Sequence, residues 1–503
     1  TWGNGSTGTS GAVSASNSLV GSAANDNVGN GGITALTNGN YVVRSTVWDN
    51  GGIVNAGAAT WGNGSTGTSG AVTASNSLVG SAASDNVGNS GITPLTNGNY
   101  VVNSQSWDNA GIVNVGAATW GNGAAGTSGA VSASNSLVGS AANDNVGNNG
   151  ITALTNGNYV VRSSIWNNGG IAGAGAATWG NGATGTSGAV TASNSLTGST
   201  ANDQIGSGGI IALTNGNYVV NSSAWDNGGI INVGAATWGN GSTGTSGAVS
   251  ASNSIVGSAA SDFVGTSGIT ALTNGNYVVG SQVWDNGGII DAGAATWGNG
   301  STGTSGAVSA SNSLVGSAAS DQIGSSITAL TNGNYVVRSP VWDNGGIIDA
   351  GAATYGFGSG GTTGTINSSN SVLGQIASAR VGSFSVLFDS TNNQMVVSRR
   401  NENIVSLFRV APTAAEASVS GRVLDANGRG LARATVSMID QSGNSRTVMT
   451  SSFGYYAFEN VDAGETYIIS VAAKRYVYES ITVNVSDSVS DIIFTPVSQV
   501  RIR

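Results

Sequence analysis

The chain contains no cysteine and no histidine, and Lys474 is its single lysine. Without cysteine it can form no disulfide framework and perform no thiol chemistry. Without histidine it lacks the usual general base, the commonest metal ligand and the Ser-His-Asp triad. Proline occurs four times in 503 residues, which excludes a proline-rich linker or a collagen. No apolar run approaches the roughly 18 residues of a membrane-spanning helix, so we expect no membrane span.

Charge is scarce and unevenly distributed. Charged residues make up 8% of the chain, and its net charge is −9. A nucleic-acid partner is not expected, because phosphate binding needs clustered Lys and Arg. Residues 1–353 contain thirteen Asp, three Arg and no Glu, whereas residues 354–503 contain twelve Lys or Arg and eleven Asp or Glu. This shift predicts that a different kind of domain begins after residue 354.

Glycine is abundant, with 81 residues, and much of it belongs to a long internal repeat. The motif TWGNG recurs every 59 residues, with its Trp at Trp2, Trp61, Trp120, Trp179, Trp238 and Trp297, and returns as TYGFG at Tyr355. The motif LTNGNYVV recurs from Leu36, Leu95, Leu154, Leu213, Leu272 and Leu330. The chain starts at Thr1 inside a copy of TWGNG, which indicates a trimmed precursor or a piece of a longer protein.

Each repeat is predicted to form four short antiparallel strands. The dipeptide Asn38-Gly39 is the strongest two-residue hairpin signal, and we expect a type I′ turn there. A second turn is expected at Trp48–Gly52, where the sequence reads WDNGG. The expected strands of this copy span residues 32–37, 40–45, 53–62 and 71–81. One such sheet cannot bury both of its faces alone, so neighbouring repeats must pack together.

Two architectures bury such sheets, a closed β-propeller and a linear β-repeat array. The segment that contains TWGNG occurs seven times, the last time as TYGFG…NSVLG. The segment that contains LTNGNYVV also occurs seven times, the last time as FDSTNNQMVVS. We therefore predict an all-β chain with a seven-bladed propeller over residues 1–411, with the linear array as the alternative. In the propeller the hairpin near residues 384–410 would complete the sheet begun by residues 1–30 and leave no open edge.

The sequence after Ala414 has a different pattern. It reads SVSGRVLDANGRGLARATVSMID and then TSSFGYYAFENVDAGETYIISVAAKRYV. The spacing of Val419, Gly421, Val423, Asp425 and Gly428, with the later Gly-x-Tyr-x-Phe, resembles the carboxypeptidase regulatory-like domain. The resemblance implies a transthyretin-like β-sandwich over residues 415–497. Such domains are usually non-catalytic modules of secreted bacterial proteins, so it also implies an extracellular or cell-surface location.

The repeats themselves resemble the LxNGNYVVxSxxWDNG…TWGNG units of large bacterial surface proteins of haemagglutinin or adhesin type. This resemblance spans residues 1–353, with weaker similarity to residue 410. It implies a role in adhesion.

Each repeat offers two candidate acidic positions. One lies in WDNGG, at Asp49, Asp108, Asp226, Asp285 and Asp343, with Asn167 in the third copy. The other lies before Val-Gly or Ile-Gly, at Asp26, Asp85, Asp144, Asp203, Asp262 and Asp321, with Arg380 expected at this place in the seventh. An enzyme needs one site and not six, so we expect turn capping and no catalytic residues. Repeated Ca²⁺ sites are the alternative, although the spacing matches no EF-hand loop; no other metal and no cofactor is expected.

Each repeat also carries two Trp, which either pack between sheets or stack on sugars. The ligand-binding candidates are the WDN motifs: Trp48, Asp49, Asn50, Trp107, Asp108, Trp166, Trp225, Asp226, Trp284, Asp285, Trp342 and Asp343. We therefore predict a non-catalytic extracellular or cell-surface structural or adhesion protein. The alternatives are a self-assembling filament subunit, with the chain itself as partner, and a multivalent lectin that binds cell-surface glycans.

Overall fold

The computed structural model describes residues 1–409, 417–440, 443–461, 465–485 and 488–499. The chain divides into two compact units, Thr1–Phe408 and Arg409–Arg503. The predicted domain boundaries at residues 411 and 415 lie outside the described residues. In the part of the chain that the structure describes, no helix has the length and apolar character needed to cross a membrane.

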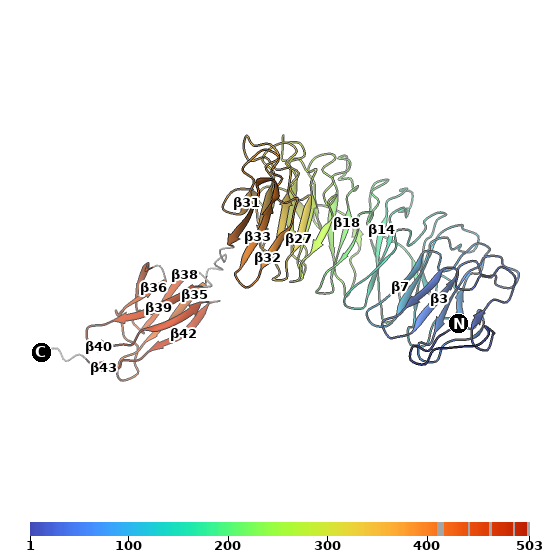
Figure 1. Cartoon of the computed structure of the whole chain (residues 1–503), viewed down its shortest axis with the longest axis horizontal. Helices are drawn as coiled ribbons and strands as arrows, with labels where there is room; N and C mark the ends of the chain where they lie inside the picture. The colour runs from blue at the N-terminus through green and yellow to red at the C-terminus, as the bar shows by residue number, and fades with distance from the viewer. Residues whose placement is uncertain (410–416, 441–442, 462–464, 486–487, 500–503) are drawn as a thin grey trace. The chain divides into compact units, whose positions relative to one another are not determined.

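Unit 1 is a row of small sheets that share one plan (Figure 1). Strand a comes from the GITA segment: β2 (Gly32–Ala35), β7 (Gly91–Pro94), β12 (Ile151–Ala153), β17 (Gly209–Ala212), β22 (Ile269–Ala271) and β27 (Ser326–Ala329). Strand b comes from YVV: β3 (Tyr41–Ser45), β8 (Tyr100–Ser104), β13 (Tyr159–Ser163), β18 (Tyr218–Ser222), β23 (Tyr277–Ser281) and β28 (Tyr335–Ser339). Strand c comes from AATWG: β4 (Ala58–Gly62), β9 (Ala117–Gly121), β14 (Ala176–Gly180), β19 (Ala235–Gly239), β24 (Ala294–Gly298) and β29 (Ala352–Gly356).

Two shorter strands complete the plan. Strand d comes from SLV: β1 (Leu19–Val20), β6 (Ser77–Val79), β11 (Ser136–Val138), β16 (Ser195–Thr197), β21 (Ser254–Val256), β26 (Ser313–Val315) and β31 (Ser371–Leu373). Strand e comes from the Gly-Ala after the TWGNG loop: β5 (Gly70–Ala71), β10 (Gly129–Ala130), β15 (Gly188–Ala189), β20 (Gly247–Ala248), β25 (Gly306–Ala307) and β30 (Gly364–Thr365).

Consecutive repeats are joined by an exchanged strand. In the sheet ordered β10-β6-β4-β3-β2, strands β2, β3, β4 and β6 pair antiparallel. Strand β10 comes from the following repeat and pairs with β6 in parallel, with Gly129 opposite Leu78. The predicted single strand over residues 71–81 is therefore divided, because β5 pairs with the preceding sheet and β6 with its own.

The apolar core lies between consecutive sheets. Val42, Ala59 and Leu78 of one sheet pack against Tyr100 and Val102 of the next, and all five are at most 1% exposed. Neighbouring residues of strand b point to opposite faces. Both faces are buried because each inner sheet has a neighbour on either side. A run such as YVV is therefore apolar without alternation, and a single repeat cannot bury its own surface.

The LTNGN hairpin has a different turn from the predicted type I′. The Leu36 N–H donates to Asn40 O at 2.8 Å, and the Gly39 N–H donates to Leu36 O at 3.1 Å. Gly39 has φ +87°, whereas Asn38 is not among the residues with positive φ. This is the pattern of a three-residue loop with a type I turn followed by a left-handed glycine. The Asn38 side chain accepts the Asn40 N–H at 3.1 Å, and this bond stabilises the three-residue loop in place of the type I′ turn.

The predicted propeller closure is not made. Strands β32 (Val386–Asp389), β33 (Gln394–Arg399) and β34 (Ile404–Arg409), with the 3₁₀ turn η1 (Arg400–Glu402), form a separate three-stranded sheet. Strand β1 pairs with β5 and not with this hairpin, so the predicted pairing is wrong. Figure 1 shows β3 and β33 near opposite ends of unit 1. The exchanged e strand links each sheet to the next along a row, which is compatible with the linear array.

Unit 2 is a β-sandwich of short strands. Its strands are β35 (Ala417–Val423), β36 (Thr435–Ile439), β37 (Ser445–Met449), β38 (Tyr455–Val461), β39 (Glu465–Ala472), β40 (Tyr476–Val477), β41 (Ile481–Val485), β42 (Val489–Phe494) and β43 (Ser498–Gln499). One sheet has the order β38-β35-β42, and the other has β37-β36-β39-β40-β43 with β41 beside β39. Val419, Val436, Phe458, Ile469 and Phe494 fill the core between them. The all-β prediction is confirmed for both units.

Candidate functional site

The six WDN tryptophans lie in the core and not on the surface. Trp48, Trp107, Trp166, Trp225, Trp284 and Trp342 are between 2% and 4% exposed. Trp48, for example, packs against Ala58, Val72 and Val79. Their indole N–H groups have no hydrogen-bond partner among the described residues. A buried ring cannot stack on a sugar from solvent, so the structure corrects the prediction that these Trp bind a ligand.

The polar residues of the WDN motif fix the turn that crosses the end of the sheet. Asp49 Oδ1 accepts the Asn55 N–H at 2.7 Å, and the Asn50 side chain donates to Gly80 O at 3.2 Å. Asp108, Asp226, Asp285 and Asp343 accept the equivalent N–H at 2.6–2.8 Å. Asn167 makes the same bond to Gly173 at 3.0 Å, because an amide oxygen is also an acceptor. These side chains therefore act as turn caps.

The second Asp of each repeat is buried and accepts several backbone donors. Asp85 is 0% exposed. Its Oδ2 accepts the N–H groups of Ser81 and Ala82, both at 2.7 Å, and its Oδ1 accepts the Asp108 N–H at 2.9 Å. The two acidic positions of a repeat are thus joined through one backbone amide. Among the described residues no three His, Cys, Asp or Glu lie together in a way that could hold a metal ion, and the Ca²⁺ alternative stays a prediction.

The ionisation of these carboxyls follows their surroundings. Burial raises the pKa of Asp85 and of Asp321, and the nearby charges of Asp108 and Asp343 add to the effect. For Asp26 burial acts in the same direction, but hydrogen bonds from the backbone of Ala23, Asp49 and Ser22 outweigh it and the pKa is lowered. The second carboxyl of each cluster, Asp108 or Asp343, accepts a backbone N–H and caps the neighbouring turn.

The other tryptophan of each repeat, in TWGNG, lies at the opposite end of the sheet and is partly exposed. The Trp61 indole N–H donates to Gly123 O of the next repeat at 2.9 Å. The side chains of Asn38 and Asn40 donate to the same oxygen, both at 2.8 Å. Gly126 approaches Trp61 so closely that a Cβ there would contact the indole. The ring is therefore held in one orientation by two repeats.

A groove lies beside this tryptophan. It has a volume of about 310 Å³ and is lined by Trp61, Thr68, Ser75 and Asn76 of one repeat and by Ala125–Ser128 of the next. The preceding groove, of about 280 Å³, is lined by the residues at the same eight repeat positions, beginning with Trp2. No lining residue of either groove is charged. Sequence reasoning placed the ligand-binding candidates at the WDN tryptophans and missed this one, although the run of Ser and Thr after TWGNG was a signal that could have pointed to it.

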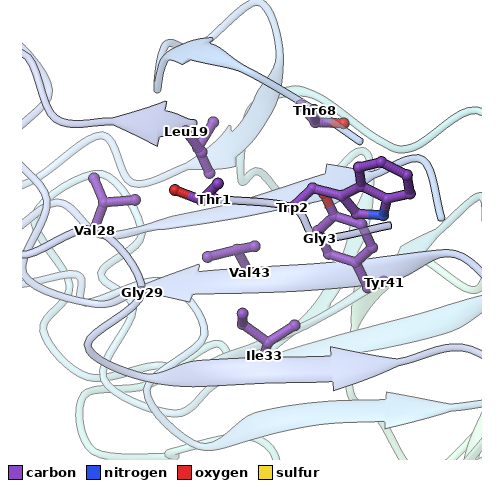
Figure 2. A pocket seen from close by; sticks show the side chains of 10 residues that line it. All are labelled: Thr1, Trp2, Gly3, Leu19, Val28, Gly29, Ile33, Tyr41, Val43 and Thr68. Carbon is purple, nitrogen blue, oxygen red and sulfur yellow. The ribbon is translucent and has the colours of Figure 1, made fainter. Parts of the chain in front are cut away.

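A further pocket of about 260 Å³ lies at the first repeat (Figure 2). It is apolar, and Trp2, Leu19, Ile33 and Tyr41 are among its lining residues. Tyr41 is partly buried, but its counterpart Tyr100 is 1% exposed. In later repeats a neighbouring sheet fills this place, so the pocket belongs to the stacking interface.

A sequence profile described as a repeat of unknown function, DUF5650, matches seven segments: residues 1–30, 35–89, 94–148, 153–207, 212–266, 271–325 and 329–383. The chain belongs to the DUF5650 repeat family. A second profile, the carboxypeptidase regulatory-like domain, matches residues 418–495, as predicted for unit 2. The predicted resemblance of the DUF5650 repeats to haemagglutinin-type surface proteins stays a prediction.

The chain also has distant likenesses among solved structures, whereas the comparison with curated proteins found no match. A C-terminal fragment of the pilus adhesin SpaC from Lactobacillus rhamnosus GG is 13% identical, with a TM-score of 0.15, over 37% of this chain and 76% of that one. The open conformation of the same adhesin is 12% identical, with a TM-score of 0.16, over 41% and 28%. At these TM-scores the likeness supports no argument about fold or function.

The seventh DUF5650 repeat ends differently from the other six. Ala379, and not Arg380 as predicted, stands where the others have the buried Asp, since Gly374 lies against Ala379 as Gly80 lies against Asp85. The missing carboxylate is supplied by Glu402 of η1, whose Oε1 accepts the Gln375 N–H at 2.7 Å. Burial raises the pKa of Glu402, but Arg399 and the Gln375 N–H outweigh it and the pKa is lowered.

If Glu402 replaces the missing Asp, then Ala379→Asp should change the free energy of unfolding in opposite directions in the native chain and in the Glu402→Ala chain. Glu402→Ala is expected to lower the free energy of unfolding by about 2 kcal/mol, because it removes the acceptor of the Gln375 N–H and the carboxylate that pairs with the largely buried Arg399 side chain. Ala379→Asp is expected to destabilise the native chain, since two carboxylates would compete for the same donors, but to stabilise the Glu402→Ala variant. Urea unfolding of the four chains of this cycle measures both effects.

The pH gives an independent check on Glu402. Because its folded pKa is lowered, its contribution is present above the unfolded pKa and is lost as pH falls through the folded pKa. The Glu402→Ala chain should therefore converge with the native chain in acid. In the urea experiment, an equal change of the unfolding free energy by Ala379→Asp in the native and Glu402→Ala chains would mean that Glu402 does not replace the missing Asp.

Proposed function

We propose that this chain is a non-catalytic structural or adhesion protein of the cell surface or extracellular space, in which the DUF5650 array is a rigid scaffold. The supporting observation is that the recurring polar side chains of each repeat bond to the backbone or to one another. Thr60 bonds Ser77 at 2.7 Å within a sheet, and Asn40 and Trp61 donate to the next repeat. Such groups stabilise an array and leave no activated nucleophile or base.

The carboxypeptidase regulatory-like domain is consistent with this proposal, because domains of this type are usually non-catalytic. Beads coated with the full chain test it. Coated beads are expected to adhere to one another or to epithelial cells several-fold more than albumin-coated beads do. Coated beads that adhere no better than the albumin control on both surfaces would contradict an adhesive role.

A filament subunit is the second candidate, and one edge of unit 1 favours it. Strand β34 is the last strand in its sheet, and Ile404, Val405 and Leu407 on it are 47%, 65% and 63% exposed. An exposed apolar edge strand readily pairs with another chain. Electron microscopy of the purified chain distinguishes the two candidates, since regular fibres that disappear in a Val405→Lys, Leu407→Lys variant would indicate self-assembly.

A further inference from the structure

We infer that the grooves beside the TWGNG tryptophans form one continuous binding track for a linear, uncharged polysaccharide. The inference deepens the proposed adhesive function, on which it rests, by naming a ligand class and a surface. It differs from the lectin alternative of the sequence in position, since that alternative used the WDN tryptophans, which are buried.

Continuity of the track follows from a shared residue. Thr68 lines the groove of Trp2 from one side and the groove of Trp61 from the other. The same residue types recur beside Trp120, Trp179 and Trp238, and beside Trp297 with Gly360 and Thr363 at two of the positions. All four Trp are partly exposed. Sheets that pack face to face lie roughly 10 Å apart, so consecutive grooves have about that spacing. A row of this kind suits an extended polymer better than a single small molecule.

The lining chemistry indicates sugars. An indole beside a groove offers an apolar surface for the C–H face of a sugar ring, and hydroxyl and amide groups can bond the sugar hydroxyls. Ser75 and Ser128 are exposed on the two sides of Trp61, with Asn76 and Thr127 next to them. The absence of charge from both described grooves disfavours acidic polysaccharides, nucleic acids and charged peptides.

The grooves are preformed. The N–H of Trp61 bonds Gly123, and its indole is packed on Gly126, so the ring loses little freedom when a ligand binds. Each groove, at 280–310 Å³, is at the small end of ligand sites, so one groove alone would bind weakly. Several grooves that engage one polymer would raise the affinity through effective concentration.

The test is binding of the full chain to insoluble cellulose, chitin and starch, with polygalacturonate as the charged polymer. We expect the chain to sediment with at least one neutral polysaccharide and not with polygalacturonate. The groove variant carries Glu at five exposed serines, which add bulk and a carboxylate that is costly to desolvate. These serines are Ser69, Ser128, Ser187, Ser246 and Ser305.

The matched control carries the same five added charges at the other end of the sheets. Its substitutions to Glu are at Val54, Val113, Ile231, Ile290 and Ile348, which are 49–66% exposed. The groove variant is expected to lose about tenfold or more in affinity, since five of the six grooves are affected at once. The control variant should bind like the native chain, and both should have the native circular dichroism spectrum.

Several outcomes would overturn the track. These are equal loss in the two variants, binding of polygalacturonate alone, or binding of a polyproline peptide in place of all three polysaccharides. If no polysaccharide binds but coated beads still adhere, the track is wrong and the adhesive function stands. If neither polysaccharide binding nor bead adhesion is observed, both the track and the adhesive function are wrong.

Discussion

Gly182→Ala is expected to destabilise unit 1 by about 3 kcal/mol, more than a surface substitution would. Gly182 is the second glycine of the fourth TWGNG motif, and a Cβ on it would overlap the carbonyl oxygen of Gly157. Its own carbonyl accepts the side chains of Asn97, Asn99 and Trp120 at 2.8–2.9 Å. A shift that relieves the overlap would weaken these three bonds, which join two repeats.

The control is Gly170→Ala in the same repeat. No atom lies within 4 Å of a Cβ built on Gly170, and its φ is outside the left-handed region. Urea unfolding followed by tryptophan fluorescence should show a lower midpoint for Gly182→Ala and a native midpoint for Gly170→Ala. Because an array can lose cooperativity, a broadened transition is also an expected sign of a weakened repeat interface. Identical curves for the two variants would contradict this account of TWGNG.

The sequence predicted the strands that local pattern determines. The LTNGNYVV hairpin and the unit 2 sandwich were predicted because a turn dipeptide, apolar runs and a family pattern mark them. The parallel e strand could not be predicted, because Gly129-Ala130 has no strand propensity and its partner Leu78 lies in the preceding repeat. That pairing helps to decide between a closed propeller and a linear array, and local sequence patterns do not encode this choice.

The candidate site was misplaced for a related reason. Trp48 and Trp61 belong to the same repeat, and composition alone treats them alike. Trp48 follows strand b and enters the core through the turn that Asp49 caps. Trp61 ends strand c, where its indole reaches the following repeat at Gly123. The two rings lie at opposite ends of the sheet, and this position alone decides that one packs in the core and the other reaches the surface.

Trp225→Ala is expected to cost about 3–5 kcal/mol of unfolding free energy, the usual result of removing a buried aromatic ring. Trp225 is 2% exposed and packs among Val220, Val233 and Val256 between two sheets. The loss combines the transfer of apolar surface with the cavity that remains. Thermal or urea unfolding of the full chain measures it.

Trp238→Ala, in the same repeat, is the matched comparison. Its ring is partly exposed and donates one bond to Gly300 O at 2.9 Å, an oxygen that also accepts Asn215 and Asn217. Because that acceptor stays paired, we expect a cost of only about 1–2 kcal/mol. If the track binds polysaccharide, Trp238→Ala should weaken binding, whereas Trp225→Ala should act only through stability. The opposite order of stabilities would mean that the WDN tryptophan is not the core residue of the repeat, and the sugar site would then have to be sought at that end of the sheets.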